Sequence, residues 1–170
     1  LTIAGKLIPI IHVNNEARMH AAGARNRGAE KASSHLIMFF DVDDIPHPQK
    51  IELTLKAFSE NTISAFVHSF TGPHHSTFHS IDHSPIESIP LYPITQKNPT
   101  CSNVYSDCPQ GVDHALHHGH ITIKKSLFNT IKFDESSKWN AGGEDGKFCQ
   151  DIVDTGIDFM HSPVKLVHYT

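Results

Sequence analysis

The stretch HLIMFFDVDD, residues 35–44, decides the fold of this chain. Its apolar part has the length of a buried strand, and that strand ends at three carboxylates, Asp41, Asp43 and Asp44. Two carboxylates about 4 Å apart repel each other by roughly 4 kcal/mol at an effective dielectric of about 20, so a cation stabilises such a cluster. Mg²⁺ and Mn²⁺ prefer oxygen ligands and often bind substrate phosphates as well. The stretch therefore predicts a metal–diphosphate site at the end of a central strand, and an acidic turn that caps a buried strand is the alternative.

The size and charge of the chain limit the classes of protein to which it can belong. Its 170 residues suffice for a hydrophobic core, and we expect residues 1–170 to form a single domain. A net charge of −4 without a basic patch disfavours nucleic acid as a partner. No apolar stretch approaches the ~20 residues that span a bilayer, and no signal-peptide pattern is present. We predict a soluble domain with a cytoplasmic location slightly favoured, and the oligomeric state is left open.

Apolar periodicity predicts helices that alternate with strands, which is typical of an α/β fold. Pro48 suits the first turn of a helix that ends at Asn61, and residues 144–154 should form another helix with Gly156 as its C-cap. The sequence thus predicts a mostly parallel central sheet flanked by helices. The helix after Pro48 is expected to bury Ile51, Leu53, Leu55 and Phe58. We expect a strand at 63–70, a strand that leads into a short helix at 120–128, and a final strand or hairpin at 157–169.

Residues 74–113 are rich in Pro, Ser, His and Asn, and we expect a long excursion with little regular structure. It is a candidate acceptor-binding loop or lid, and a mobile surface insertion is the alternative. Many of the fifteen histidines lie in this excursion or just after it, with spacings that match no zinc template. We interpret these histidines as polar loop residues: His74, His75, His79, His83, His114, His117, His118 and His120.

A second chemical signal is WNAGGED, residues 139–145. Its glycines allow the backbone to pass close to a ligand, and Glu144 and Asp145 open a helix whose dipole stabilises negative charge. Placed opposite the first acidic cluster, one of these carboxylates could take a proton from an attacking hydroxyl. Simple capping of the helix is the alternative interpretation.

The order of three motifs resembles nucleotide-sugar glycosyltransferases of the GT-A fold, and is most similar to the inverting enzymes of family 2. The motifs are ARNRG at 24–28, FDVDD at 40–44 and GEDG at 143–146, and the resemblance covers roughly residues 22–55 and 121–169. It implies a hexosyl-transferring enzyme with a UDP-sugar as the expected donor and a glycan, protein or small molecule as the acceptor. The N-terminal part of the family, which recognises the nucleotide, has no match here, so we expect N-terminal residues to be missing, and a base-recognition site that is built differently is the alternative.

The resemblance also implies roles for individual residues. Asp43 would bind Mn²⁺ or Mg²⁺ directly, while Asp41 would lie nearer the ribose or a metal-bound water. On the last strand His168 would be an additional metal ligand, with His161 as its competitor. The remaining implied roles are Asp145 as catalytic base, Glu144 as acceptor-orienting residue, Arg25, Asn26 and Asp44 as donor contacts, and Trp139 and Gly143 as acceptor contacts.

Two other functions remain open at this point. Phosphatases of the haloacid dehalogenase type also place Asp-x-Asp after an apolar strand, although they continue with a Gly-Thr-like turn where this chain has Ile45 and Pro46. A non-enzymatic module that binds a metal or a carbohydrate through its histidines is the second alternative.

Overall fold

The structure is a computed structural model that describes residues 2–3, 6–7, 9–14, 20–71, 84–97, 104–106, 120–136 and 143–168. Its helices are α1 (Ala21–Lys31), α2 (Lys50–Glu60), α3 (Lys125–Phe128) and α4 (Glu144–Asp154). Its strands are β1 (Thr2–Ile3), β2 (Lys6–Leu7), β3 (Leu36–Met38), β4 (Ile45–Pro46), β5 (Ala65–Thr71), β6 (Tyr92–Lys97), β7 (Val104–Ser106), β8 (Thr122–Lys124) and β9 (Phe159–His168).

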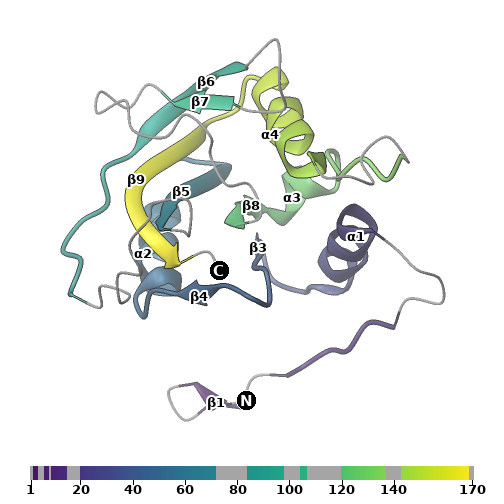
Figure 1. Cartoon of the computed structure of the whole chain (residues 1–170), viewed down its shortest axis with the longest axis horizontal. Coiled ribbons are helices and arrows are strands. Elements are labelled where there is room, and N and C mark those ends of the chain that lie inside the picture. The colour runs from purple at the N-terminus through teal and green to yellow at the C-terminus, as the bar shows by residue number, and fades with distance from the viewer. Residues whose placement is uncertain are drawn as a thin grey trace.

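One mixed sheet forms the centre of the molecule (Figure 1), with the strand order β3-β8-β5-β9-β6-β7 and with β4 paired to β9. The predicted α/β fold is confirmed, but the expectation of a mostly parallel sheet is wrong for the described residues. Only β5 and β9 pair in parallel there, and every other pairing is antiparallel. As the alternation of helices and strands predicts, β3, β5 and β9 run in the same direction. The alternation did not reveal that β8 lies between β3 and β5 in the opposite direction.

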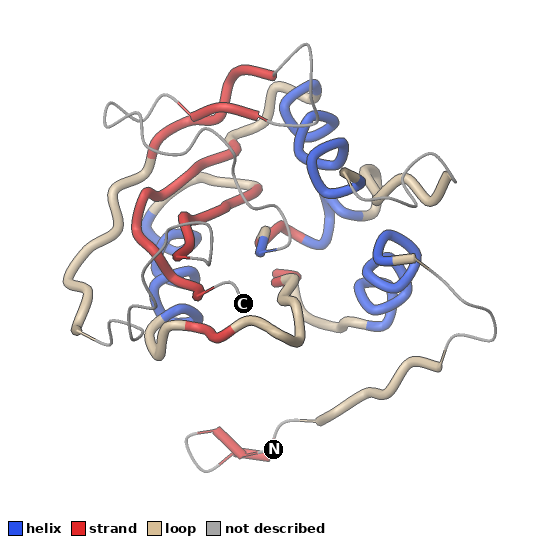
Figure 2. Tube along the Cα trace, viewed as in Figure 1, coloured by secondary structure: helices blue, strands red, loops and turns tan. Residues whose placement is uncertain are grey.

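The two faces of the sheet are covered by different helices (Figure 2). Ala65 and Val67 of β5 face a core that includes residues of α1 and α4, whereas Phe66 packs with Ala57 of α2. This separation follows from the two-residue period of a strand, which sends successive side chains to opposite faces. The core on the side of α1 and α4 contains Ala22, Ala29, Phe128, Phe133, Phe148 and Ile152.

The helix boundaries follow the sequence signals closely. Helix α4 spans the predicted residues, and Gly156 beyond its end has a φ of 69°, a left-handed conformation that favours glycine. Helix α2 ends before Asn61 as predicted, but its expected apolar face is wrong in part. Ile51 and Leu55 are 55% and 51% exposed, while the buried side includes Leu53. The spacing of apolar residues allowed two faces, and the face that carries the small Ala57 packs against Phe66.

The excursion at 74–113 contains more regular structure than the sequence indicated. Strand β6 pairs with β9 through Tyr92 and Pro93, and β7 pairs with β6, so the expectation of little regular structure is wrong for 92–97 and 104–106. Pro93 stands within β6 although proline cannot donate a ladder hydrogen bond. The histidines at 74–83 and 114–118 lie outside the described residues, and the loop or lid function stays a prediction.

The strand directions bring several chain segments to one edge of the sheet. The carboxyl ends of β3, β5 and β9 lie at this edge, and so does the amino end of the antiparallel β8. Asp41, Thr71, His120 and His168 therefore meet there although they are far apart in sequence. Ligands of open α/β sheets bind beyond the carboxyl ends of their strands, so this edge is the place to look for a site.

Candidate active site

The acidic stretch after β3 forms a tight turn. The backbone N–H of Asp44 donates a hydrogen bond to the carbonyl oxygen of Asp41 at 3.3 Å, and Val42 at the tip is fully exposed. Asp41 is half-buried and Asp44 is buried, whereas Asp43 points to the exposed side. Strand β4 then pairs antiparallel with the end of β9, and this pairing folds the turn back onto the sheet.

Asp41, Asp44 and His120 form a group that could hold a metal ion, with one potential ligand atom from each residue within 4.8 Å of the others. His120 Nε2 lies 2.6 Å from a carboxylate oxygen of Asp44, and both side chains are almost completely buried. Carboxylates suit Mg²⁺ and Mn²⁺, and imidazole suits transition metals. The donor set therefore fits a divalent cation, and its single imidazole favours Mn²⁺ over Mg²⁺.

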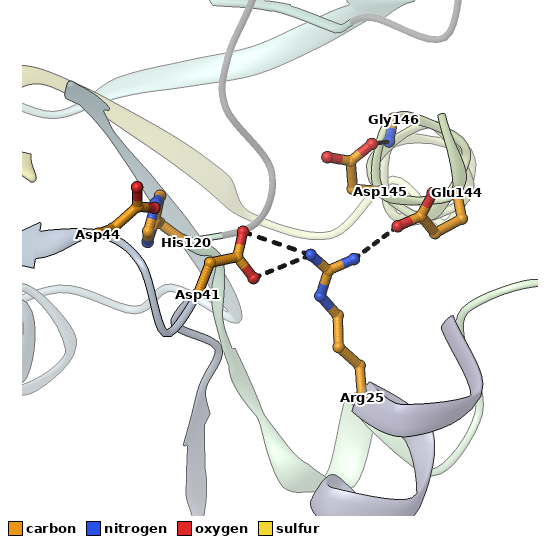
Figure 3. Close-up of polar contacts among 7 residues, drawn as sticks. All are labelled: Arg25, Asp41, Asp44, His120, Glu144, Asp145 and Gly146. Carbon is orange, nitrogen blue, oxygen red and sulfur yellow. Dashed lines mark hydrogen bonds and ion pairs between the residues drawn. The ribbon is translucent and has the colours of Figure 1, made fainter. Parts of the chain in front are cut away.

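Arg25 of α1 connects this group to the second acidic cluster (Figure 3). Its Nη1 donates to Glu144 Oε1 at 2.7 Å, and its Nη2 donates to Asp41 Oδ1 at 3.1 Å. The guanidinium also lies over the ring of Phe133, 5.4 Å from the ring centre. Burial by itself lowers the pKa of Arg25, but the negative charges of Asp41, Asp145 and Glu144 raise it overall. One permanent positive charge thus joins the two carboxylate clusters that the sequence placed opposite each other.

The start of α4 is built around Gly143. Its φ of 97° is a left-handed conformation, which explains glycine at this position, and its carbonyl oxygen accepts the N–H of Lys147 at 3.0 Å. Glu144 and Asp145 follow in the first turn, where the helix dipole stabilises negative charge. Asp145 accepts the N–H of Gly146 at 2.7 Å, and its carboxylate lies on the same side of α4 as Glu144, toward the acidic turn (Figure 3).

Asn26 lies next to Arg25 but contacts a different part of the chain. Its amide donates to the carbonyl oxygen of Phe133 at 2.9 Å and to Glu135 at 2.7 Å, and its own oxygen accepts the N–H of Phe133 at 3.0 Å. The side chain is buried, so these hydrogen bonds fix the segment after Phe133 against α1. Its implied contact with the donor stays a prediction.

His168 lies at the end of β9, outside the group formed by Asp41, Asp44 and His120. Its Nδ1 is 3.1 Å from the hydroxyl of Thr71, and its backbone lies opposite Ile45 of β4. The metal-ligand roles implied for His168 and Asp43 stay predictions. Trp139 lies outside the described residues. The competitor His161 is buried with its Nε2 3.1 Å from the hydroxyl of Ser69, and burial lowers its pKa to about 4.

His120 is the site residue that the sequence analysis missed. It was interpreted as a loop histidine because it follows a histidine-rich segment. The signal that could have found it is its position directly before the strand that begins at Thr122. Once β8 is known to run antiparallel to β3, a residue before β8 must lie beside the residues that follow β3.

A buried basic cluster, formed by Lys50, His68 and His161, lies next to this group. The Lys50 ammonium contacts His68 Nε2 and lies 5.4 Å from the ring centre of Phe40. The ring of His68 in turn stacks on that of His120 at 5.9 Å. Burial lowers the pKa of Lys50 to about 7, although Asp44 raises it, and burial together with Lys50 lowers the pKa of His68 well below its usual value. Near neutral pH His68 and His161 are therefore uncharged, and Lys50 carries only part of its usual charge.

Comparisons with known proteins agree with this geometry. The sequence model of glycosyl transferase family 2 matches residues 2–129. Among solved structures, S. aureus TarS (residues 1–349) is similar with a TM-score of 0.53 and 15% identity, over 88% of this chain and 40% of that chain. This likeness shows the fold, and the present chain spans about 40% of the length of that structure. No curated protein matches significantly. None of the helices that the structure describes is long and apolar enough to cross a membrane.

Proposed function

Because the chain belongs to glycosyl transferase family 2, we propose that it transfers a sugar from a nucleoside-diphosphate donor to an acceptor hydroxyl. The observation that carries this proposal is the ion pair of Arg25 with both Asp41 and Glu144, which places a group that could hold a metal ion and the helix start that carries Asp145 on two sides of one cation. The membership in a glycosyltransferase family disfavours a phosphatase and a non-enzymatic module.

Asp41, Asp44 and His120 would hold a divalent cation, with Mn²⁺ as the better fit. When bound, the cation offsets the negative charge that develops on the leaving nucleoside diphosphate. The side chains bring two formal negative charges and one imidazole, which balance the charge of a divalent ion and would leave coordination positions open for phosphate oxygens. The exposed Asp43 would contact the donor or a metal-bound water from the outer side of the turn.

Arg25 would be the phosphate contact. Its guanidinium is always charged, and its fork geometry matches phosphate oxygens as well as carboxylates. In the structure it neutralises Asp41 and Glu144, and a donor phosphate next to the metal could replace one of these partners. The stacking on Phe133 keeps the guanidinium in place during this exchange.

Asp145 would act as the general base. It stands in the first turn of α4, across Arg25 from the acidic turn, so the acceptor hydroxyl would be deprotonated on the side opposite the leaving diphosphate. Attack from that side inverts the anomeric carbon. Glu144 is already fixed by Arg25 at 2.7 Å, which suits an orienting role rather than proton transfer.

A thermal-shift panel of UDP-, GDP- and dTDP-sugars with and without Mn²⁺ tests the proposal. A ligand that binds the folded state stabilises it by RT ln(1 + [L]/Kd), so one class of nucleotide sugar should raise the Tm only when Mn²⁺ is present. Asp44→Asn should abolish that shift. Asp154→Asn, at the far end of α4, is the matched control and should retain it. No Mn²⁺-dependent shift with any nucleotide sugar would refute the proposal.

A further inference from the structure

A cavity lies beside the candidate active site, at the carboxyl end of β9. It has a volume of about 340 Å³, within the range of roughly 300–1,000 Å³ that is usual for small-ligand pockets. It owes its shape to an irregular stretch of β9, because the pairing with β5 shifts register on both sides of Ser69. Pro163 and Val164 leave the ladder there and line the cavity. Such bulges are frequent next to functional sites.

The opposite wall of the cavity is held by Gln49. Its side-chain oxygen accepts the N–H of Ile86 at 2.8 Å, and its amide donates to the carbonyl oxygen of the same residue at 3.4 Å. The two hydrogen bonds attach the segment that begins at Ser84 to the start of α2. Both sides of the cavity are therefore formed by backbone segments that hydrogen bonds hold in place.

The polar groups that line the cavity are cationic or can donate hydrogen bonds. Lys165 brings an ammonium group, and Thr71 and Ser84 bring hydroxyls. His47 is buried, and its Nδ1 accepts the N–H of Gln49 at 3.2 Å, so its proton resides on Nε2. His168 adds a second imidazole. No carboxylate is among the described residues that line the cavity, so none of their side chains would repel a negatively charged ligand.

We propose that this cavity binds a phosphoryl group of the acceptor. The inference rests on the proposed function, because it assigns the cavity to the substrate that receives the sugar. His168 lies opposite Ile45, and Ile45 directly follows Asp44, so the cavity adjoins the acidic turn. The donor diphosphate would have its own partners in Arg25 and in the group of Asp41, Asp44 and His120. The cavity lacks lining carboxylates for a metal and would hold a phosphate directly through Lys165.

Titration calorimetry with glycerol 3-phosphate and with glycerol tests this inference. Glycerol 3-phosphate should bind and glycerol should not, and 0.5 M NaCl should weaken the binding because salt screens exposed charges. Lys165→Gln should weaken it about tenfold or more, since a charge-assisted hydrogen bond is lost. Lys132→Gln removes an exposed ammonium outside the cavity and should leave the affinity unchanged. Binding to vesicles that contain phosphatidylglycerol would indicate a lipid-borne phosphate, whereas binding to glycerol 3-phosphate without binding to the vesicles would indicate a soluble one.

The outcomes separate this inference from the proposed function. Equal weakening in Lys165→Gln and Lys132→Gln would overturn it, because binding would then follow overall charge. Displacement of glycerol 3-phosphate by UDP with Mn²⁺ would also overturn it, because the cavity would then belong to the donor. Neither result affects the Mn²⁺-dependent thermal shift by nucleotide sugars, which tests the proposed function alone. A lower KM for the phosphorylated than for the unphosphorylated acceptor, lost in Lys165→Gln, would support the acceptor role.

Discussion

Two groups of residues adjoin the same edge of the sheet and differ in how much charge they carry. We call Arg25 with its partners Asp41 and Glu144 the reactive region, and the buried basic cluster the supporting region. Arg25 contacts two carboxylates, and their negative charges raise its pKa. Lys50 contacts the imidazole of His68 instead, and burial lowers the pKa of both groups. Arg25 and its carboxylate partners keep their full charges, which a charged ligand can bind. The supporting region keeps the histidines uncharged and reduces the charge of Lys50, so that these groups pack under the acidic turn and compete less for phosphate.

This contrast explains why the two regions should respond differently to the same kind of substitution. Removal of the Arg25 guanidinium leaves the carboxylates of Asp41 and Glu144 without their positive partner, which is costly in a partly buried site. Removal of the Lys50 ammonium, whose charge is disfavoured by burial, takes away a contribution that lowers the free energy of unfolding. Variants of Asp145, Arg25 and Lys50 therefore test whether the division between a reactive and a supporting region is real.

The largest effect is expected for Asp145→Asn. An amide cannot accept the acceptor proton, and general base catalysis contributes roughly 10²–10⁴-fold, so kcat should fall by about that factor. The Kd for UDP with Mn²⁺ should stay within about twofold of the wild type, because the metal-binding group is intact. Initial rates of sugar transfer and calorimetry on the same preparation provide both values. Asp154→Asn is the control on the same helix, and transfer that survives in Asp145→Asn would remove this residue from the base role.

Arg25→Met should lower the free energy of unfolding by about 2–3 kcal/mol, somewhat less than the 3–5 kcal/mol typical of a fully buried pair. The reason is that Asp41 and Glu144 lose their shared partner. The variant should bind Mn²⁺ alone at least tenfold more tightly, since one competing positive charge is gone. Urea denaturation and Mn²⁺ titration provide the two measurements. A stable variant with unchanged Mn²⁺ affinity would mean that Arg25 does not join the two clusters.

Lys50→Met should change the free energy of unfolding, and the sign of this change should depend on pH. The folded-state pKa of Lys50 is about 7 against 10.5 in the unfolded chain, so the unfolded state binds more protons between these values and wild-type stability rises with pH there. At pH 6 the variant should be more stable by roughly 1–2 kcal/mol, because a buried ammonium is removed. At pH 9.5 it should be less stable by roughly 1 kcal/mol, because His68 Nε2 loses its partner. Thermal unfolding across this range checks the reversal, and a pH-independent difference would contradict it.

The sequence predicted the reactive region better than the supporting one. Asp41 and Glu144 stand in local motifs, a strand end and a helix start, whose positions follow from short-range patterns. His120 depends on the direction of β8, and Lys50 is buried on α2 although the apolar spacing does not indicate this. Strand direction and helix rotation are set by tertiary packing, which a local pattern does not encode. The β-bulge at Ser69 escaped prediction for the same reason.

The smallest effect tests whether the reactive region depends on charge pairs or on overall stability. Gly28 is exposed within α1, one turn after Arg25, and an added Cβ would meet no atom within 4 Å. Gly28→Ala should therefore raise the free energy of unfolding by about 0.5–1 kcal/mol, the usual difference in helix propensity. Gly156→Ala should lower it by about 1 kcal/mol, because its φ of 69° strains alanine although its Cβ would also meet no atom within 4 Å. Both variants should bind UDP with Mn²⁺ as the wild type does, since neither alters a charged contact of Arg25. A change of affinity that follows stability in this pair would show that the site responds to the rigidity of the fold, and the contrast between the two regions would lose its electrostatic basis.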